Sequence, residues 1–185
     1  FEGIRSGDDA RISDVRIYGT GSTGIVTGRH SEIRNTTVAA TSAYGIRADH
    51  DVAIRDSVVR AAASHGVVTA GAPLVSRSRI NGNGGMGIRV LGAGGSVRGH
   101  VLAGNGDLAL RAEHVVFTDN MVSQNALGLV LNDGYASVVG GNAFAQSPLV
   151  DVGSPRNALV VDNAIHGNVN ANSDSGTNGN VLGQV

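Results

Sequence analysis

Short apolar phrases recur along the chain at a nearly constant interval. In most of them a Gly precedes an aliphatic residue, and successive phrases start 21, 21, 21, 21, 22, 19 and 22 residues apart. The eight phrases are Gly3-Ile4-Arg5, Gly24-Ile25-Val26, Gly45-Ile46-Arg47, Gly66-Val67-Val68, Gly87-Ile88-Arg89, Ala109-Leu110-Arg111, Gly128-Leu129-Val130 and Val150-Asp151-Val152. A period of this length indicates a solenoid, in which each repeat buries its apolar face against its neighbours.

A second apolar series keeps the same period. Pairs of apolar residues five positions apart begin at Ile12, Ile33, Ile54, Val75, Val97, Phe117, Val139 and Val160, and Val181 continues the series. Gly, Asn, Asp and Ser separate the runs, and Gly and Asn accept the left-handed backbone conformation that tight turns require. No 3.6-residue periodicity is sustained, so helices are not expected.

Two or three short strands per 21–22 residues, stacked coil upon coil, predict an all-β, single-stranded right-handed parallel β-helix of about eight to nine coils. Successive coils should rise by about 4.8 Å, the spacing of neighbouring strands. Parallel crossover connections are nearly always right-handed. Leucine-rich repeats would need a regular Leu and Asn frame, and propeller blades would need about 40 residues per unit.

We expect residues 1–169 to form the β-helix, without its natural N-terminal cap, and residues 170–185 to form a partial last coil and a polar tail. The chain starts at Phe1, inside a repeat, which suggests a piece of a longer protein whose export signal lies outside it. The expected location is extracellular, periplasmic or on a cell or virion surface.

The balance of charged side chains limits the classes of molecule that the protein is expected to bind. Fourteen positive side chains, all Arg, balance fifteen negative ones, giving a net charge of −1. This balance argues against a nucleic-acid or anionic-membrane surface. No apolar stretch approaches the roughly 20 residues of a membrane-spanning helix. The chain has no Cys and only 3% aromatic residues.

Side-chain alternation predicts an arginine-bearing face. If the aliphatic residue of each phrase faces the core, the following residue points to solvent. Arg5, Arg47, Arg89 and Arg111 would then lie on the outer face of one sheet, with Val26 and Val68 between them. Arg binds carboxylates through two parallel hydrogen bonds, so this face is a candidate track for an acidic polymer. The alternative is a strand surface kept soluble by charge.

The densest polar cluster follows that strand. Asp8-Asp9, Arg29-His30 and Asp49-His50-Asp51 occupy equivalent positions in three consecutive coils. Such a set could transfer protons or hold a hard cation, or it could be a solvated turn. Elsewhere, Asn120, Asn142 and Asn163 share one position, with Ser78 and His100 in line. We expect this stack to bond turn backbone groups, and Tyr44 and His65 to pack near a corner.

The repeats resemble the right-handed parallel β-helix proteins related to pectate lyases, a superfamily that includes polysaccharide lyases, mannuronan C5-epimerases and phage tailspikes. The segment from Tyr44 to Asp51 resembles the Tyr-Gly-x-Asp-Pro-His segment of the epimerases. Tyr44 matches directly; Arg47 stands at the Asp position and Ala48 at the Pro position, and His50 comes one residue late. A one-residue shift on a strand reverses the face to which a side chain points.

This resemblance implies an acidic glycan as partner and C5 proton abstraction, by a lyase or an epimerase, as chemistry. It implies Tyr44, His50 and Asp49 as catalytic residues. Arg47, Arg89, Arg5, Arg111 and His30 would bind substrate. Either no cofactor is needed, or Asp49 and Asp51 hold a calcium ion. The alternative is a non-catalytic solenoid, such as a phage tail-fibre or bacterial surface segment, as a homo-oligomer or attached to a larger chain.

Overall fold

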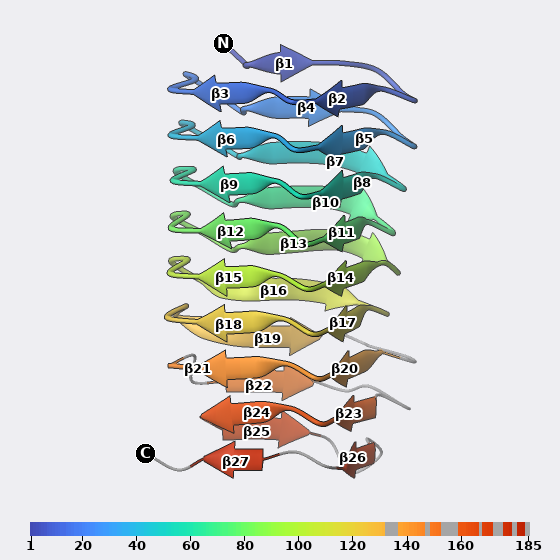
Figure 1. Cartoon of the computed structure of the whole chain (residues 1–185), viewed down its shortest axis with the longest axis vertical. Helices are drawn as coiled ribbons and strands as arrows, with labels where there is room; N and C mark the ends of the chain where they lie inside the picture. The colour runs from blue at the N-terminus through green and yellow to red at the C-terminus, as the bar shows by residue number, and fades with distance from the viewer. Residues whose placement is uncertain are drawn as a thin grey trace.

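Strands and turns build the whole described part of the chain. The structure is a computed structural model, and it describes all residues except 132–136, 147–148, 153–158, 167, 172–175, 179–180 and 184–185. Side chains are described for 1–131, 137–146 and 159–166. Within these ranges three parallel sheets of nine strands each run along a common axis (Figure 1).

The first sheet contains one strand from each apolar phrase. Its strands are β1 (Ile4–Arg5), β4 (Ile25–Thr27), β7 (Ile46–His50), β10 (Val67–Gly71), β13 (Ile88–Ala93), β16 (Leu108–Glu113), β19 (Leu127–Leu131), β22 (Leu149–Val152) and β25 (Asn168–Ala171).

The second apolar series supplies the other two sheets. The second sheet contains β2 (Arg11–Ser13), β5 (Glu32–Arg34), β8 (Ala53–Arg55), β11 (Leu74–Ser76), β14 (Ser96–Arg98), β17 (Val116–Thr118), β20 (Val138–Gly140), β23 (Leu159–Val161) and β26 (Gly176–Asn178). The third contains β3 (Arg16–Tyr18), β6 (Thr37–Ala39), β9 (Val58–Arg60), β12 (Arg79–Asn81), β15 (Val101–Ala103), β18 (Met121–Ser123), β21 (Ala143–Ala145), β24 (Ala164–His166) and β27 (Val181–Gly183).

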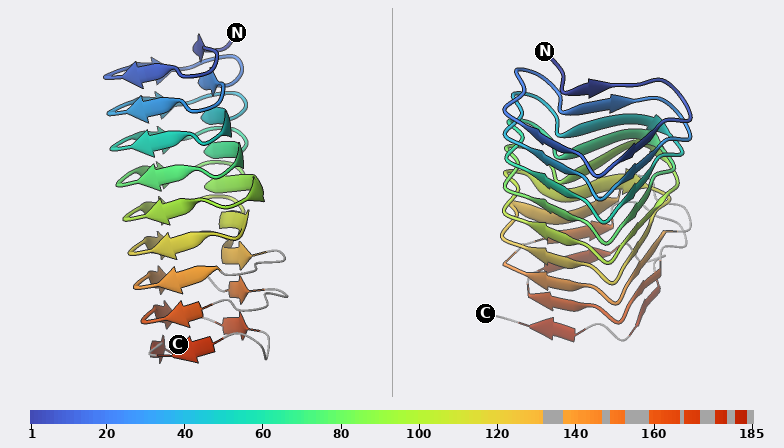
Figure 2. Two further views of the ribbon diagram at one scale, coloured as in Figure 1. Left: turned by 90° about the vertical axis from the view of Figure 1, so that its right-hand side faces the viewer. Right: turned by 45° about the horizontal axis from the view of Figure 1, so that its top comes forward.

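Each strand pairs with the equivalent strand one coil away, so the sequence period becomes the hydrogen-bond register. Ile25, for example, pairs with Ile46, and Val67 pairs with Ile88. The two ends of the chain consequently lie at opposite ends of the solenoid (Figure 2). The parallel β-helix predicted from the sequence is confirmed.

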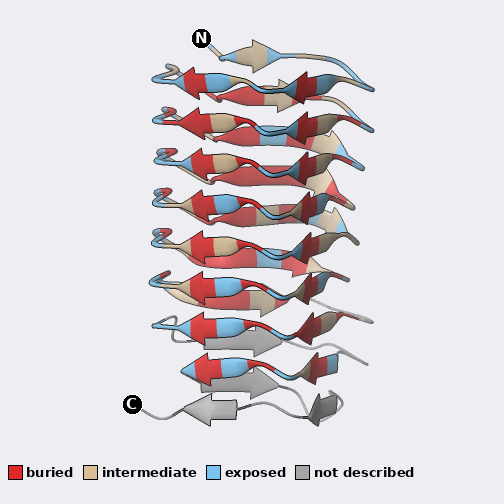
Figure 3. Ribbon diagram, viewed as in Figure 1, coloured by how far each residue is buried: buried red, intermediate tan, exposed pale blue. Residues whose placement is uncertain are grey.

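Buried residues occur in the strands of all three sheets (Figure 3), and their apolar side chains form one core cluster. Ile46 from the first sheet, Ile54 from the second and Val59 from the third are completely buried. In the lower coils Phe117 and Phe144 belong to the same cluster, with ring centroids 6.2 Å apart. Fully burying each such side chain stabilises the fold by roughly 1.5–3 kcal/mol, and the stacking places the outward residues at fixed heights.

Left-handed residues turn the chain at each corner that the structure describes. The Gly-rich turns behave as predicted at Gly82 and Gly104, whose φ angles are 63° and 62°. Non-Gly residues, however, occupy many equivalent positions. At the corner after the first sheet, Asp9, His30 and Asp51 have φ angles of 56°, 54° and 57°. Asp and Asn tolerate this conformation better than most residues, and His is also enriched there.

Buried amides hold the corner between the second and third sheets, as the sequence predicted. The backbone N–H of Asn120 donates to Asn142 Oδ1 at 2.9 Å, and that of Asn142 donates to Asn163 Oδ1 at 3.0 Å. The same pattern continues through His100, whose Nδ1 accepts from the Ser78 N–H at 3.1 Å. These side chains satisfy backbone donors that no strand partner reaches.

A second amide stack, which the sequence analysis missed, lies between the third sheet and the next coil. Asn83, Asn105 and Asn125 are buried there in consecutive coils. Asn83 Nδ2 donates to Asn105 Oδ1 at 2.9 Å, and Asn105 Nδ2 donates to Asn125 Oδ1 at 2.8 Å. Its signal in the sequence is a Gly-Asn-Gly triplet at residues 82–84 and 104–106, which on its own indicates only a turn.

Candidate functional site

The outer face of the first sheet carries the predicted arginine column. Register places Arg5 beside Val26, Val26 beside Arg47, Val68 beside both Arg47 and Arg89, and Arg89 beside Arg111. Arg5, Arg47 and Arg111 are exposed and Arg89 is half-buried. Val68 points outward, but only 7% of it is exposed. We attribute this to the long side chains that flank it, because Arg stems cover neighbouring apolar surface.

The arginines are unevenly spaced along the axis. Arg5 and Arg47, like Arg47 and Arg89, are two coils or about 10 Å apart, whereas Arg89 and Arg111 are adjacent at about 5 Å. Arg5 is paired, because its Nε donates to Glu2 Oε2 at 2.6 Å. This hydrogen bond lowers the pKa of Glu2 and raises that of Arg5. Among the described residues Arg47 and Arg89 form no ion pair.

A cleft of about 390 Å³ opens on this face. Arg5, Arg47 and Asp49 contribute its charged groups, while Val68 and the exposed Leu91 are among its apolar lining residues. Cations next to an apolar wall suit a ligand with a carboxylate and a nonpolar ring face. The cleft therefore joins two of the predicted substrate-binding arginines to one of the predicted catalytic residues.

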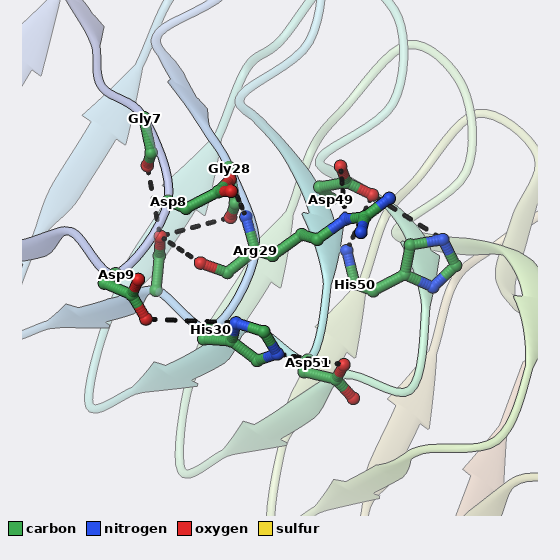
Figure 4. A network of polar contacts seen from close by, with 10 residues as sticks. Gly7, Asp8, Asp9, Gly28, Arg29, His30, Asp49, His50 and Asp51 are labelled. Carbon is green, nitrogen blue, oxygen red and sulfur yellow. Dashed lines mark hydrogen bonds and ion pairs between the residues drawn. The ribbon is translucent and has the colours of Figure 1, made fainter.

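The polar cluster of the following turn comprises two sets of contacts (Figure 4). In the first, Arg29 lies between carboxylates of the coils above and below. Its backbone N–H donates to Asp8 Oδ1 at 2.8 Å, and its Nε lies 3.4 Å from Asp49 Oδ2. Asp49 also accepts the backbone N–H of His50 at 2.9 Å, so its carboxylate is held in place beside the cleft.

In the second set, His30 lies between two carboxylates on its neighbouring coils. Its Nδ1 is 3.8 Å from Asp9 Oδ1, and its Nε2 is 3.7 Å from Asp51 Oδ2. The three residues are exposed and share the left-handed backbone geometry of that corner. They border a separate hollow on the side of the second sheet, with Arg11 and Arg55. His30, predicted to bind substrate, is thus outside the cleft that contains Arg47.

His50 is seated over a glycine of the next coil. Its register partner is Gly71, and a Cβ at Gly71 would lie 2.8 Å from His50 Nδ1. The His50 Nε2 is 3.6 Å from Asp49 Oδ1, and about half of the side chain is exposed. The structure therefore brings the predicted catalytic residues Asp49 and His50 together. Gly71 makes room for the imidazole, which the sequence analysis did not foresee.

Tyr44 lies elsewhere. It precedes β7, of which His50 is the last residue, so the length of the strand, roughly 13 Å at 3.3 Å per residue, separates the two. Tyr44 stacks instead on His65 with ring centroids 5.7 Å apart and an interplanar angle of 17°. The packing expected for Tyr44 and His65 is present, and the three predicted catalytic side chains do not meet at one point.

The residues present do not fit a calcium site. Asp49 contacts Arg29 and the His50 N–H, whereas Asp51 contacts His30. Within the described ranges no group of three or more His, Asp or Glu side chains is arranged to hold a metal ion. The same part of the chain has no helix with the length and apolarity needed to cross a membrane.

The repeat and its register agree with a known family. The sequence model of the family described as right handed beta helix region matches residues 3–102, more than half of the chain. The chain belongs to this right-handed β-helix family. A comparison with curated proteins gives no significant match.

Solved structures with the same architecture include two epimerases and a phage tailspike domain. The A-module of the mannuronan C-5 epimerase AlgE6 of Azotobacter vinelandii is 17% identical, with a TM-score of 0.70 over 95% of this chain and 58% of that one. The periplasmic alginate epimerase AlgG is 13% identical, with a TM-score of 0.67 over 96% of this chain and 50% of that one. The enzymatically active domain of bacteriophage CBA120 tailspike protein 2 is 15% identical, with a TM-score of 0.60 over 97% of this chain and 33% of that one. This chain therefore spans 58%, 50% and 33% of the length of these three neighbours. At such low sequence identities the similarity shows a shared fold only.

Proposed function

We propose that the β-helix binds an acidic polysaccharide along the outer face of its first sheet, with Arg47 and Arg89 holding uronate carboxylates. The observation that carries this proposal is that both guanidinium groups lack an ion-pair partner among the described residues while lying in one outward column. Arg47 also lines the cleft of about 390 Å³. A repeating anion is the ligand that matches repeated cations at fixed heights.

Carboxylate recognition by these residues has a simple physical basis. A guanidinium presents parallel N–H groups that match the two oxygens of a carboxylate. Because Arg47 is exposed and Arg89 is only half-buried, each contact should be modest and sensitive to salt. Several contacts along a polymer add up through multivalency. Two structural neighbours are a mannuronan and an alginate epimerase, which supports a uronan as the first polymer to test.

We extend the proposal to C5 proton abstraction at the Asp49–His50 pair. Removing the C5 proton of a uronate leaves negative charge on the carboxylate, which a nearby cation must stabilise. Arg47 and Asp49 line one cleft, and His50 adjoins Asp49. His50 would take the proton. An epimerase would return a proton to the opposite face of C5, whereas a lyase would form the C4–C5 double bond by expelling the oxygen on C4.

Tyr44 has no part in this step at the same sugar unit, because the length of β7 separates it from His50. This differs from the set of catalytic residues that the family resemblance implied. Arg89 and Arg111, adjacent in register, would bind a neighbouring carboxylate of the same polymer.

Binding is tested by calorimetric titration of the protein with polymannuronate and polygalacturonate. Arg47→Gln and Arg89→Gln should each weaken binding by about three- to tenfold, or roughly 0.7–1.4 kcal/mol, the size expected for one contact that remains accessible to solvent. Arg79→Gln on β12 is the matched control, since it removes an exposed Arg from the third sheet. Equal weakening by all three variants would contradict a specific track.

Catalysis is tested on the same polymers. Ultraviolet absorbance of unsaturated uronate reports a lyase, and proton NMR of the polymer reports an epimerase. We expect one of the two signals, and its loss in His50→Asn. Silence in both assays with binding intact would restrict the function to adhesion. Silence together with absent binding would favour the non-catalytic solenoid, such as a tail-fibre or surface-protein segment.

A further inference from the structure

We propose that His65, stacked on Tyr44, forms a subsite that binds the free hydroxyl groups of the polysaccharide beside the arginine column. This inference rests on the proposed function, because it needs the polymer to lie on the first sheet. It assigns to that face a way of distinguishing a uronan with free hydroxyls from one whose hydroxyls are esterified.

The position of the pair follows from the repeat. Tyr44 and His65 each lie two residues before a strand of the first sheet, one coil apart. Glu2 occupies the equivalent position in the first coil, and its carboxylate reaches the guanidinium of Arg5, three residues further on. In that coil the side chain at this position therefore reaches an arginine of the column. The charge of Arg89 also acts on the His65 imidazole.

Three contacts fix the orientation of His65. The ring stacks on Tyr44 at 5.7 Å and 17°. Its Nδ1 accepts the backbone N–H of Met86 at 2.9 Å. Gly85 provides the space, because a Cβ there would lie 2.5 Å from His65 Nδ1. With one face against Tyr44 and Nδ1 bonded to the Met86 N–H, the ring presents its Nε2 edge to a ligand.

The same contacts fix its protonation. Since Nδ1 accepts a hydrogen bond, the neutral ring must carry its proton on Nε2. Burial is the main cause that lowers the pKa of His65, the charge of Arg89 adds to it, and Asp107 opposes it. At neutral pH His65 is therefore a neutral N–H donor. It cannot serve as a base at Nε2, which separates its role from that of His50.

The donor edge of the pair is available to a ligand. Within the described residues neither the Tyr44 hydroxyl nor His65 Nε2 has a hydrogen-bond partner, and neither is among the buried polar atoms that lack one. Each ring covers one face of the other, which leaves the edges for recognition. An N–H donor and a phenolic hydroxyl one coil apart match the hydroxyl oxygens along a sugar chain. O-acetylation turns that hydroxyl oxygen into an ester oxygen, which is a poorer acceptor for the His65 N–H. It also removes the proton that the Tyr44 oxygen could accept, and it adds bulk at that position.

The test compares calorimetric binding of oligomannuronate and chemically O-acetylated oligomannuronate. Wild-type protein should prefer the free-hydroxyl ligand by roughly three- to tenfold for each hydrogen bond lost. Tyr44→Phe keeps the stacked ring and removes the hydroxyl. His65→Asn keeps an acceptor for the Met86 N–H, because Asn Oδ1 takes the place of Nδ1, and it removes the Nε2 donor. Both variants should lose preference while still binding.

Arg47→Gln separates this inference from the proposed function. It should weaken binding of both ligands and leave their ratio unchanged. A wild-type protein that binds both ligands equally, or variants that retain the full preference, would overturn the hydroxyl subsite alone. A wild-type protein that binds neither ligand would overturn the proposed function and this subsite with it. Tyr44→Phe keeps the test decisive if His65→Asn does not fold.

Discussion

Replacing Asn142 by Ala should remove several kilocalories of folding free energy. Asn142 is 2% exposed. Its Oδ1 accepts from the Asn120 backbone N–H at 2.9 Å and from Asn120 Nδ2 at 3.0 Å, and its Nδ2 donates to the Phe117 carbonyl at 2.9 Å. Leaving a buried polar group without a partner costs roughly 1–3 kcal/mol. Three such groups, partly relieved by relaxation, give an expected loss of about 3–5 kcal/mol.

Urea unfolding followed by far-ultraviolet circular dichroism measures this loss. Asn35→Gly is the control, because Asn35 is exposed, has a φ of 47° and bonds Asp14 at the surface. Gly keeps the left-handed backbone, so the control should change stability by less than about 1 kcal/mol. A loss in Asn142→Ala no larger than that of the control would refute the conclusion that the buried amide stack holds this corner.

Three further predictions concern the histidines and the core. Burial lowers the pKa of His100, so this residue takes up a proton at higher pH in the unfolded chain than in the folded one. The free energy of unfolding should therefore decline as the pH falls below about 6.5. Urea midpoints measured against pH test this, and His100→Asn should make them depend less on pH. Gly71→Ala should displace the His50 ring and shift its NMR resonances, whereas Gly7→Ala, where a Cβ meets nothing within 4 Å, should not. Unshifted His50 resonances in Gly71→Ala would contradict the contact between His50 and Gly71. Phe117→Ala should lower the free energy of unfolding by about 3–5 kcal/mol, measured by urea denaturation, and a loss below 1 kcal/mol would argue against a packed interior.

The fold could be predicted because one physical constraint acts on every coil. A strand repeat that stacks in register must return to the same residue class after the same number of positions, so Ile25, Ile46, Val67 and Ile88 reveal the period directly. The period is visible even where it varies. The interval after Ile88 lengthens to 22 residues, and the register between β13 and β16 shifts at that place.

Corner geometry was only partly predictable. Gly82 and Gly104 indicate left-handed turns in the sequence. His30, Ala61 and Arg77 adopt the same backbone conformation, with φ angles of 54°, 53° and 46°. No local preference favours Ala or Arg there. The stacked coils impose the conformation, so a residue-by-residue assessment of turn propensity could not find it.

Site residues were predictable as a group and not as an arrangement. The repeat placed Arg47 and Asp49 on one outward face, because alternation along a strand is a local property. It could not show that Tyr44 stacks on His65, because the position of the His65 ring depends on the space at Gly85, one coil further along the chain. Glycines that make room for a neighbour's side chain carry no recognisable signal of their own in the sequence.

Chemical-shift mapping during titration with oligomannuronate tests most directly whether the first sheet is the binding face. We expect perturbed backbone amides to concentrate in β7, β10 and β13, with the side chains of Arg47 and Arg89 shifting at the lowest ligand concentrations. Perturbations centred on β8 and β12, on the other two sheets, or spectra that do not change at saturating ligand, would contradict this expectation.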